Sequence, residues 1–165
     1  FICSIIMCLL VNQCFTINAQ ELPTTGVGGE HITWTYDVET KTLTFTGYGK
    51  TGTLSGWDDM HGSVQDCGDW YVLRETVEKL VFSEGITEIA NSAFKHFVKL
   101  KEVEFSSTIT TIDDEAFLGS GLEKITIPST IKKVGCEVFI CPELKEVVIE
   151  EGVEKIADML AMISY

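Results

Sequence analysis

The side chains best suited to chemistry gather in one short segment, residues 57–71. Four aspartates and a histidine occupy it: Asp58, Asp59, His61, Asp66 and Asp69. Carboxylate oxygens bind hard cations such as Ca²⁺, but the spacing here does not fit an EF-hand loop. Acid–base catalysis would need two carboxylates at a defined separation in a pocket. We therefore interpret the segment as a solvated acidic loop, anchored by Trp57 and Trp70, and predict no catalytic residue.

The six cysteines do not read as a disulfide framework. Three of them lie in the first 14 residues, in a segment that we expect to be cleaved off. The remaining three, Cys67, Cys136 and Cys141, are an odd number. A bridge between Cys136 and Cys141 and free thiols packed as small apolar side chains are both open interpretations. No pair has the spacing of zinc ligands, so we predict no metal and no cofactor.

The charge of the chain excludes two classes of partner. Twenty-five acidic residues against twelve basic ones give a net charge of -13. Nucleic-acid binding requires clustered Lys and Arg side chains that displace counterions. Adhesion to anionic lipid requires a polybasic face. We therefore expect no nucleic-acid partner and no electrostatic membrane contact.

Four copies of one apolar template fill the second half of the chain. They begin at Val77, Leu100, Leu122 and Leu144, at spacings of 23, 22 and 22 residues. Counted from these first residues, apolar side chains recur at four offsets. Offset +3 holds Leu80, Val103, Ile125 and Val147, and offset +5 holds Phe82, Phe105, Ile127 and Ile149. Offset +9 holds Ile86, Ile109, Ile131 and Val153, and offset +12 holds Ile89, Ile112, Val134 and Ile156. The column at +17 holds Phe94, Phe117 and Phe139, then breaks at Ala161, and predicts an aromatic ladder in the core. This period with its L-x-x-[LVI]-x-[FI] head predicts a leucine-rich-repeat solenoid of the α/β type, rich in strands and short turns.

The segments before the repeats have distinct roles. Residues 1–12 are almost wholly apolar and no charge precedes Glu21, so residues 1–20 predict a secretory signal peptide whose true start is missing. An uncleaved anchor helix is the alternative. Residues 31–36 and 42–46 alternate with period two around a polar turn, which predicts a β-hairpin. Because a solenoid end must be covered, we interpret residues 21–74 as an N-terminal hairpin cap and loop, and residues 75–165 as the four repeats.

Several segments of the chain resemble one family of repeat proteins. The segments are GEHITWTYD (29–37), TLTFTG (42–47), VFSEGITEI (81–89) with Ala93-Phe94, and ITIP (125–128). Together they resemble the BspA-like leucine-rich-repeat surface proteins of mucosal bacteria and parasitic protists, over roughly residues 26–160. The resemblance implies a right-handed solenoid, a secreted or cell-surface location, and adhesion to host matrix or to other cells.

Offsets +2 and +4 of each repeat are expected to point outward from a concave sheet, because neighbouring strand residues face opposite sides. These positions are the candidate binding residues: Lys79, Val81, Glu102, Glu104, Lys124, Thr126, Glu146 and Val148. Charges at +1 and +2 alternate in sign from one repeat to the next. Stacked strands would then pair opposite charges, so the charges help to set the register. The side chains left for a ligand form a small, mildly apolar stripe of Val81, Glu104, Thr126 and Val148.

The sequence therefore predicts a non-enzymatic protein of the cell surface or extracellular space. Its expected partner is a protein or a cell-surface ligand, including host matrix, with no small-molecule substrate. The alternative is a structural module, part of a longer repeat protein, that self-associates through its apolar C-terminal end at residues 159–163.

Overall fold

The computed structural model describes residues 21–53 and 68–151. Several predictions therefore lie outside the described residues. These are the signal peptide, the loop residues Asp58, Asp59, His61 and Asp66, the anchor Trp57, the thiol of Cys67, the column residues Val153 and Ile156, and the chain around Ala161.

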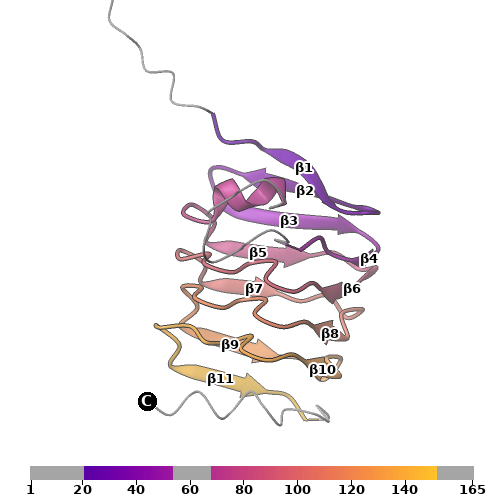
Figure 1. Cartoon of the computed structure of the whole chain (residues 1–165), viewed down its shortest axis with the longest axis vertical. Helices are drawn as coiled ribbons and strands as arrows, with labels where there is room; N and C mark the ends of the chain where they lie inside the picture. The colour runs from indigo at the N-terminus through magenta and orange to yellow at the C-terminus, as the bar shows by residue number, and fades with distance from the viewer. Residues whose placement is uncertain (1–20, 54–67, 152–165) are drawn as a thin grey trace, which may run out of the picture.

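One side of the molecule is a sheet that begins with the hairpin and continues into the repeats (Figure 1). Its order is β1-β2-β3-β5-β7, where β1 is Thr25–Gly29, β2 is Ile32–Asp37, β3 is Thr42–Gly47, β5 is Lys79–Phe82 and β7 is Glu102–Glu104. The first three strands are antiparallel, and β3, β5 and β7 are parallel. Below them, β9 (Lys124–Ile127) and β11 (Glu146–Ile149) form a separate parallel pair.

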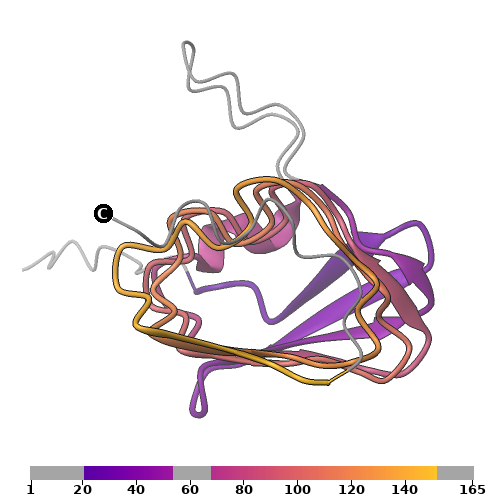
Figure 2. The same ribbon diagram turned by 90° about the horizontal axis from the view of Figure 1, so that it is seen from below.

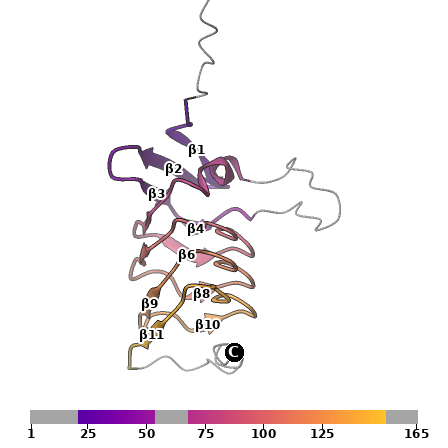
Figure 3. The same cartoon turned by 90° about the vertical axis from the view of Figure 1, so that its left-hand side faces the viewer.

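A second parallel sheet runs along another side of the same stack. Its order is β10-β8-β6-β4, where β4 is Gly49–Lys50, β6 is Ile86–Ile89, β8 is Thr111–Ile112 and β10 is Lys133–Val134. Figures 2 and 3 show successive repeats lying over one another, each closed by irregular turns. Within the described residues the only helix is the 3₁₀ helix η2, Asp69–Leu73. The strand-rich, nearly helix-free architecture is that of a leucine-rich repeat fold, with turns where an α/β repeat would carry helices.

Most described residues of the repeat columns are buried in the core, as predicted. The remaining ones pack against it partly buried: Val103, Phe105, Val134, Val147 and Ile149. Leu80, Ile86, Ile109 and Ile131 are fully buried or nearly so. The Phe column stacks as a ladder: the ring centroids of Phe94 and Phe117 are 5.7 Å apart, and those of Phe117 and Phe139 are 5.8 Å apart. Burial of this kind contributes about 25 cal/mol per Å² of apolar surface, and it ties each repeat to the next.

The hairpin joins directly onto the first repeat. Its strand β3 pairs in register with β5, so that Thr42 lies opposite Lys79 and Phe45 opposite Phe82. The buried Phe45 ring packs edge-on against Trp70, at 5.4 Å between centroids. The Trp70 indole donates a hydrogen bond to the Ala93 carbonyl at 2.9 Å. Both the predicted hairpin and the anchoring role of Trp70 are therefore present.

The strand ladder is interrupted between the second and third repeats. The amides of Glu102 and Glu146 donate to the carbonyls of Glu78 and Glu123 in the repeat before them, at 3.2 and 3.3 Å. Among the described residues, Lys124, at the same repeat position, has no such bond, and β7 and β9 do not pair. Figure 1 shows the wider separation of these two strands. The same repeats stay joined on the second sheet, where β8 pairs with β10.

The described cysteines are not bridged. Cys136 is exposed and Cys141 is buried, and both are free. Burial raises the pKa of the Cys141 thiol, whose Sγ lies 3.2 Å from the Ser120 hydroxyl. Of the two interpretations of this pair, the free-thiol one therefore holds, with only Cys141 packed in the core.

Candidate binding face

The candidate residues occupy the outward side of the strands, which we call the sheet face. In β5 and β9 the alternation is strict: Leu80, Phe82, Ile125 and Ile127 are buried, while their neighbours are exposed or half-buried. The structure places all eight candidates there: Lys79 and Val81 on β5, Glu102 and Glu104 on β7, Lys124 and Thr126 on β9, Glu146 and Val148 on β11.

The register brings the candidates on β5 and β7 together. Lys79 lies opposite Glu102, and Val81 lies opposite Glu104. The Lys79 ammonium contacts both carboxylates, that of Glu102 at 3.1 Å and that of Glu104 more closely. Hydrogen bonds, first to Glu104 and then to Glu102, raise the pKa of Lys79. This lysine is therefore held by its own sheet.

The candidates on β9 and β11 form a second group. Lys124 lies opposite Glu146, with 2.9 Å between their charged atoms, and Thr126 lies opposite Val148. Because β7 and β9 do not pair, the structure gives two clusters where the sequence predicted one continuous stripe. No ion pair joins Glu102 to Lys124 among the described residues.

The charges at offset +1 also form two groups, one on each side of the interruption between β7 and β9. Glu78 accepts from Lys101 at 2.8 Å and from Lys41 at 2.5 Å, and these lysines, Lys101 first, lower the pKa of Glu78 to about 2. In the second group Lys145 lies 2.7 Å from Glu123 and lowers its pKa. The predicted charge ladder is present on each side of the β7–β9 interruption, and Lys41 extends it onto the hairpin.

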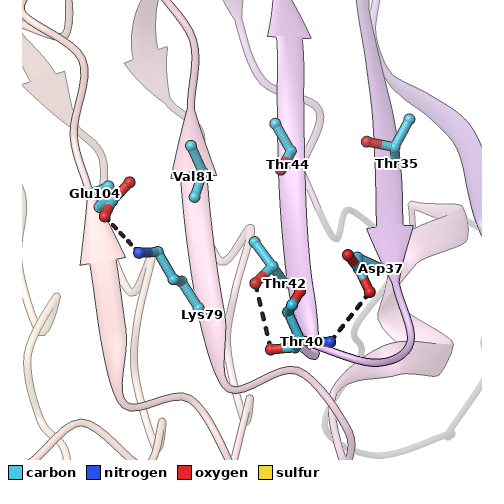
Figure 4. Close-up of a pocket in the computed structure, with 8 residues that line it drawn as sticks. All are labelled: Thr35, Asp37, Thr40, Thr42, Thr44, Lys79, Val81 and Glu104. Carbon is cyan, nitrogen blue, oxygen red and sulfur yellow. Dashed lines mark hydrogen bonds and ion pairs between the residues drawn. The ribbon is translucent and has the colours of Figure 1, made fainter.

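An open depression of about 490 Å³ lies on the sheet face where the hairpin meets the first two repeats. Its lining comes from four strands and the hairpin turn: Thr35, Asp37, Thr40, Thr42, Thr44, Lys79, Val81 and Glu104 (Figure 4). Three of these are candidates from the repeats, and sequence reasoning missed the five from the hairpin. The Thr-x-Thr alternation of both hairpin strands carries a signal, but by itself this pattern predicts only a hairpin.

The charged groups of the depression are held by neighbouring groups of the fold. The Asp37 carboxylate accepts from the amides of Glu39 and Thr40 at 2.9 and 3.1 Å, which lowers its pKa. Lys79 is ion-paired, so neither group is poised for proton transfer. Over residues 21–53 and 68–151, no three His, Cys, Asp or Glu side chains gather as metal ligands. A search of the same residues for a helix with the length and hydropathy of a membrane span finds none.

Comparison with protein families identifies the repeats. A family model described as "BspA type Leucine rich repeat region (6 copies)" matches residues 72–160, more than half of the chain. The chain belongs to the BspA-type leucine-rich repeat family. The match begins inside η2 and runs through all the repeats, so the resemblance seen in the sequence is confirmed. No curated protein matches this BspA-type chain at a significant level.

Solved structures of repeat proteins are similar to this BspA-type chain. A leucine-rich repeat protein from Eubacterium ventriosum has 15% identity and a TM-score of 0.50, with 79% of this chain and 45% of that one covered. A leucine rich cell surface protein from Faecalibacterium prausnitzii has 26% identity and a TM-score of 0.46, covering 51% and 23%. The chain spans less than half the length of either protein. The first likeness supports the fold alone.

Proposed function

We propose that this BspA-type protein is a secreted or cell-surface adhesion protein without enzymatic activity, which binds a protein or cell-surface ligand such as host matrix. The repeats wind as a right-handed solenoid, the β2–β3 hairpin caps its first end, and residues 1–20 direct the chain into the secretory pathway. Leucine-rich repeat proteins generally bind other proteins. The sheet face is the surface that we assign to this contact.

The observation that carries the proposal is that the lysines of the sheet face are ion-paired within the face, while the side chains between them are uncharged. Its lysines are occupied by carboxylates of the same face: Lys79 by Glu102 and Glu104, Lys124 by Glu146. Val81, Thr126 and Val148 remain as uncharged side chains between these ion pairs. A partner therefore gains little from long-range attraction and more from burying this small surface. The contact is weak for one copy and strengthened when many copies are displayed.

Binding to purified matrix proteins and to epithelial cells tests the proposal. The chain is displayed in many copies on beads and compared with beads that carry the double variant Val81→Arg, Val148→Arg. We expect the wild-type beads to be retained and the variant beads to be lost, because an arginine at each position covers the uncharged surface. A matched control, Thr87→Arg with Thr110→Arg, changes exposed residues of the second-sheet side and keeps retention. Absence of wild-type retention on every matrix protein and cell type would overturn the proposal.

A structural role by self-association is the second candidate. In the last described repeat, Leu144, Val147 and Ile149 are only partly buried, whereas Leu122 and Ile125 of the repeat before are 0% and 3% exposed. This apolar end would stack on a second copy. Sedimentation at micromolar concentration distinguishes the two functions: a dimer that Val147→Glu dissociates favours self-association, and a monomer excludes it.

A further inference from the structure

We propose that the hairpin carries a second binding site, for a neutral, hydroxyl-rich ligand: a short oligosaccharide chain. This inference goes beyond adhesion through the repeats, because the site lies on β2 and β3. Its basis is the outward side of the two hairpin strands, where every position between the hairpin ends carries a threonine.

The threonines form a regular grid. Thr33 lies opposite Thr46, and Thr35 lies opposite Thr44. We call these four residues the threonine strip. Thr33, Thr35 and Thr46 are exposed and Thr44 is half-buried. None of the four hydroxyls has a hydrogen-bond partner among the described residues. The fold therefore leaves all four free for a ligand.

Different chemistry bounds the strip at each end. At one end His31 and Tyr48 continue the pairing, since the Tyr48 amide donates to the His31 carbonyl at 3.3 Å. Their rings stack at 4.6 Å between centroids, and Tyr48 is 61% exposed. At the other end the strip runs into the depression, whose lining includes Thr35 and Thr44 of the strip together with Asp37 and Lys79 (Figure 4). From His31 to Asp37 the strand advances by about 20 Å, at roughly 3.4 Å per residue.

This order of groups matches a sugar chain. A threonine hydroxyl both donates and accepts a hydrogen bond, as the hydroxyls of a sugar do. The β-branched side chain is restricted at χ1, so each hydroxyl loses little rotamer freedom on binding. An exposed aromatic ring offers a flat apolar surface for the C–H face of a sugar ring. Val27, opposite Thr33 on β1 and 62% exposed, adds an apolar border. The length fits several linked sugars better than one.

The same observations disfavour a peptide as the occupant. Both hairpin strands are already paired on their two edges, β2 with β1 and β3, and β3 with β2 and β5. A peptide cannot join the sheet here by strand addition. The four side chains of the strip are all threonines, which offer no large apolar surface for an anchoring side chain of a peptide. Its four side chains are uncharged in a chain with a net charge of -13, which favours a neutral ligand.

Titration of the purified chain with cellotetraose, maltotetraose and tetra-N-acetylchitotetraose tests the proposal, with affinity measured by calorimetry and contacts by NMR. We expect at least one tetrasaccharide to bind and to shift the resonances of Thr35, Thr44 and Tyr48. The double variant Thr35→Val, Thr44→Val keeps the side-chain shape and removes two hydroxyls, and should weaken binding about tenfold. Tyr48→Ala should weaken it by a similar factor, and Tyr48→Phe should not.

Two controls separate this site from the repeats and from misfolding. Thermal midpoints of all variants should equal the wild-type value, because the fold does not use these hydroxyls. Val148→Arg, one half of the double variant designed to abolish adhesion through the repeats, should leave tetrasaccharide affinity unchanged. The proposal is overturned if no tetrasaccharide binds, if the double valine variant binds as tightly as the wild type, or if glucose alone binds equally well. It is also overturned if the valine variant loses a protein partner while no saccharide binds.

Discussion

Among the carboxylates that the structure describes, Glu78 is the one whose pKa its neighbours lower most. Lys101 and Lys41 lower its pKa from 4.5 to about 2, because both donate hydrogen bonds to the ionised form. A depressed carboxyl pKa stabilises the folded state above the unfolded pKa, and this contribution is lost as the pH falls from 4.5 towards 2. The side chain is partly exposed and open to solvent screening, so the effect is modest and sensitive to salt.

We predict that Glu78→Gln makes the midpoint temperature of unfolding less dependent on pH in the acid range. The difference in midpoint between wild type and variant should be largest near neutral pH and should shrink between pH 4.5 and about 2. Circular dichroism melts across this range measure it, with Glu39→Gln in the exposed hairpin turn as the control. A difference that stays constant through the acid range would show that Glu78 and its lysines are not coupled to folding.

The Phe ladder makes a second prediction for one residue. Phe117 is fully buried and stacks on Phe94 and Phe139, so Phe117→Ala should lower the free energy of unfolding by about 3–5 kcal/mol. Phe105 is only partly buried, and Phe105→Ala should cost clearly less. Denaturant unfolding of both variants gives the comparison. Equal losses would mean that the ladder does not hold the repeats together.

At the scale of elements, the interruption between β7 and β9 divides the sheet into two parts. We predict that the Lys124 amide exchanges with solvent faster than the equivalent amides of Lys79, Glu102 and Glu146. The Lys79 amide is bonded to Lys41 of the hairpin turn, and the other two are bonded to the preceding repeat. Hydrogen exchange followed by NMR measures all four at once. Similar protection at Lys124 would show that the strands pair in solution and that the sheet is continuous.

The strands and the Phe ladder could be predicted from the sequence, whereas the left-handed turn residues and the depression could not. The apolar columns predicted the core strands and the Phe ladder because a 22-residue period fixes which side chains face inward. The positive φ angles of Ser92, Glu115 and Glu137, all at offset +15, had no such signal, since neither residue type is the usual choice for the left-handed region. The hairpin's part in the depression was missed because it depends on β3 pairing with β5, a contact between residues far apart in the chain.

For the whole molecule, membership of the BspA-type family and the stacked repeats account for the shape, and the outward side chains account for how it would be used. Alternating charges set the register within each part of the sheet. The surfaces that we propose for ligands are the uncharged residues of the repeats and the threonine strip of the hairpin. The charge pattern could be predicted from the sequence. The division between β7 and β9 could not, because Glu102 and Lys124 have the charges that a continuous ladder would need.

Methyl NMR of the chain with a bound matrix or cell-surface protein tests the adhesion account most directly. The methyl groups of Val81, Thr126 and Val148 report on the sheet face, and those of Thr87 and Thr110 report on the side of the second sheet. We predict that partner binding shifts and broadens the first set and leaves the second unchanged. Shifts confined to Thr87 and Thr110 would contradict the assignment of the sheet face as the binding surface.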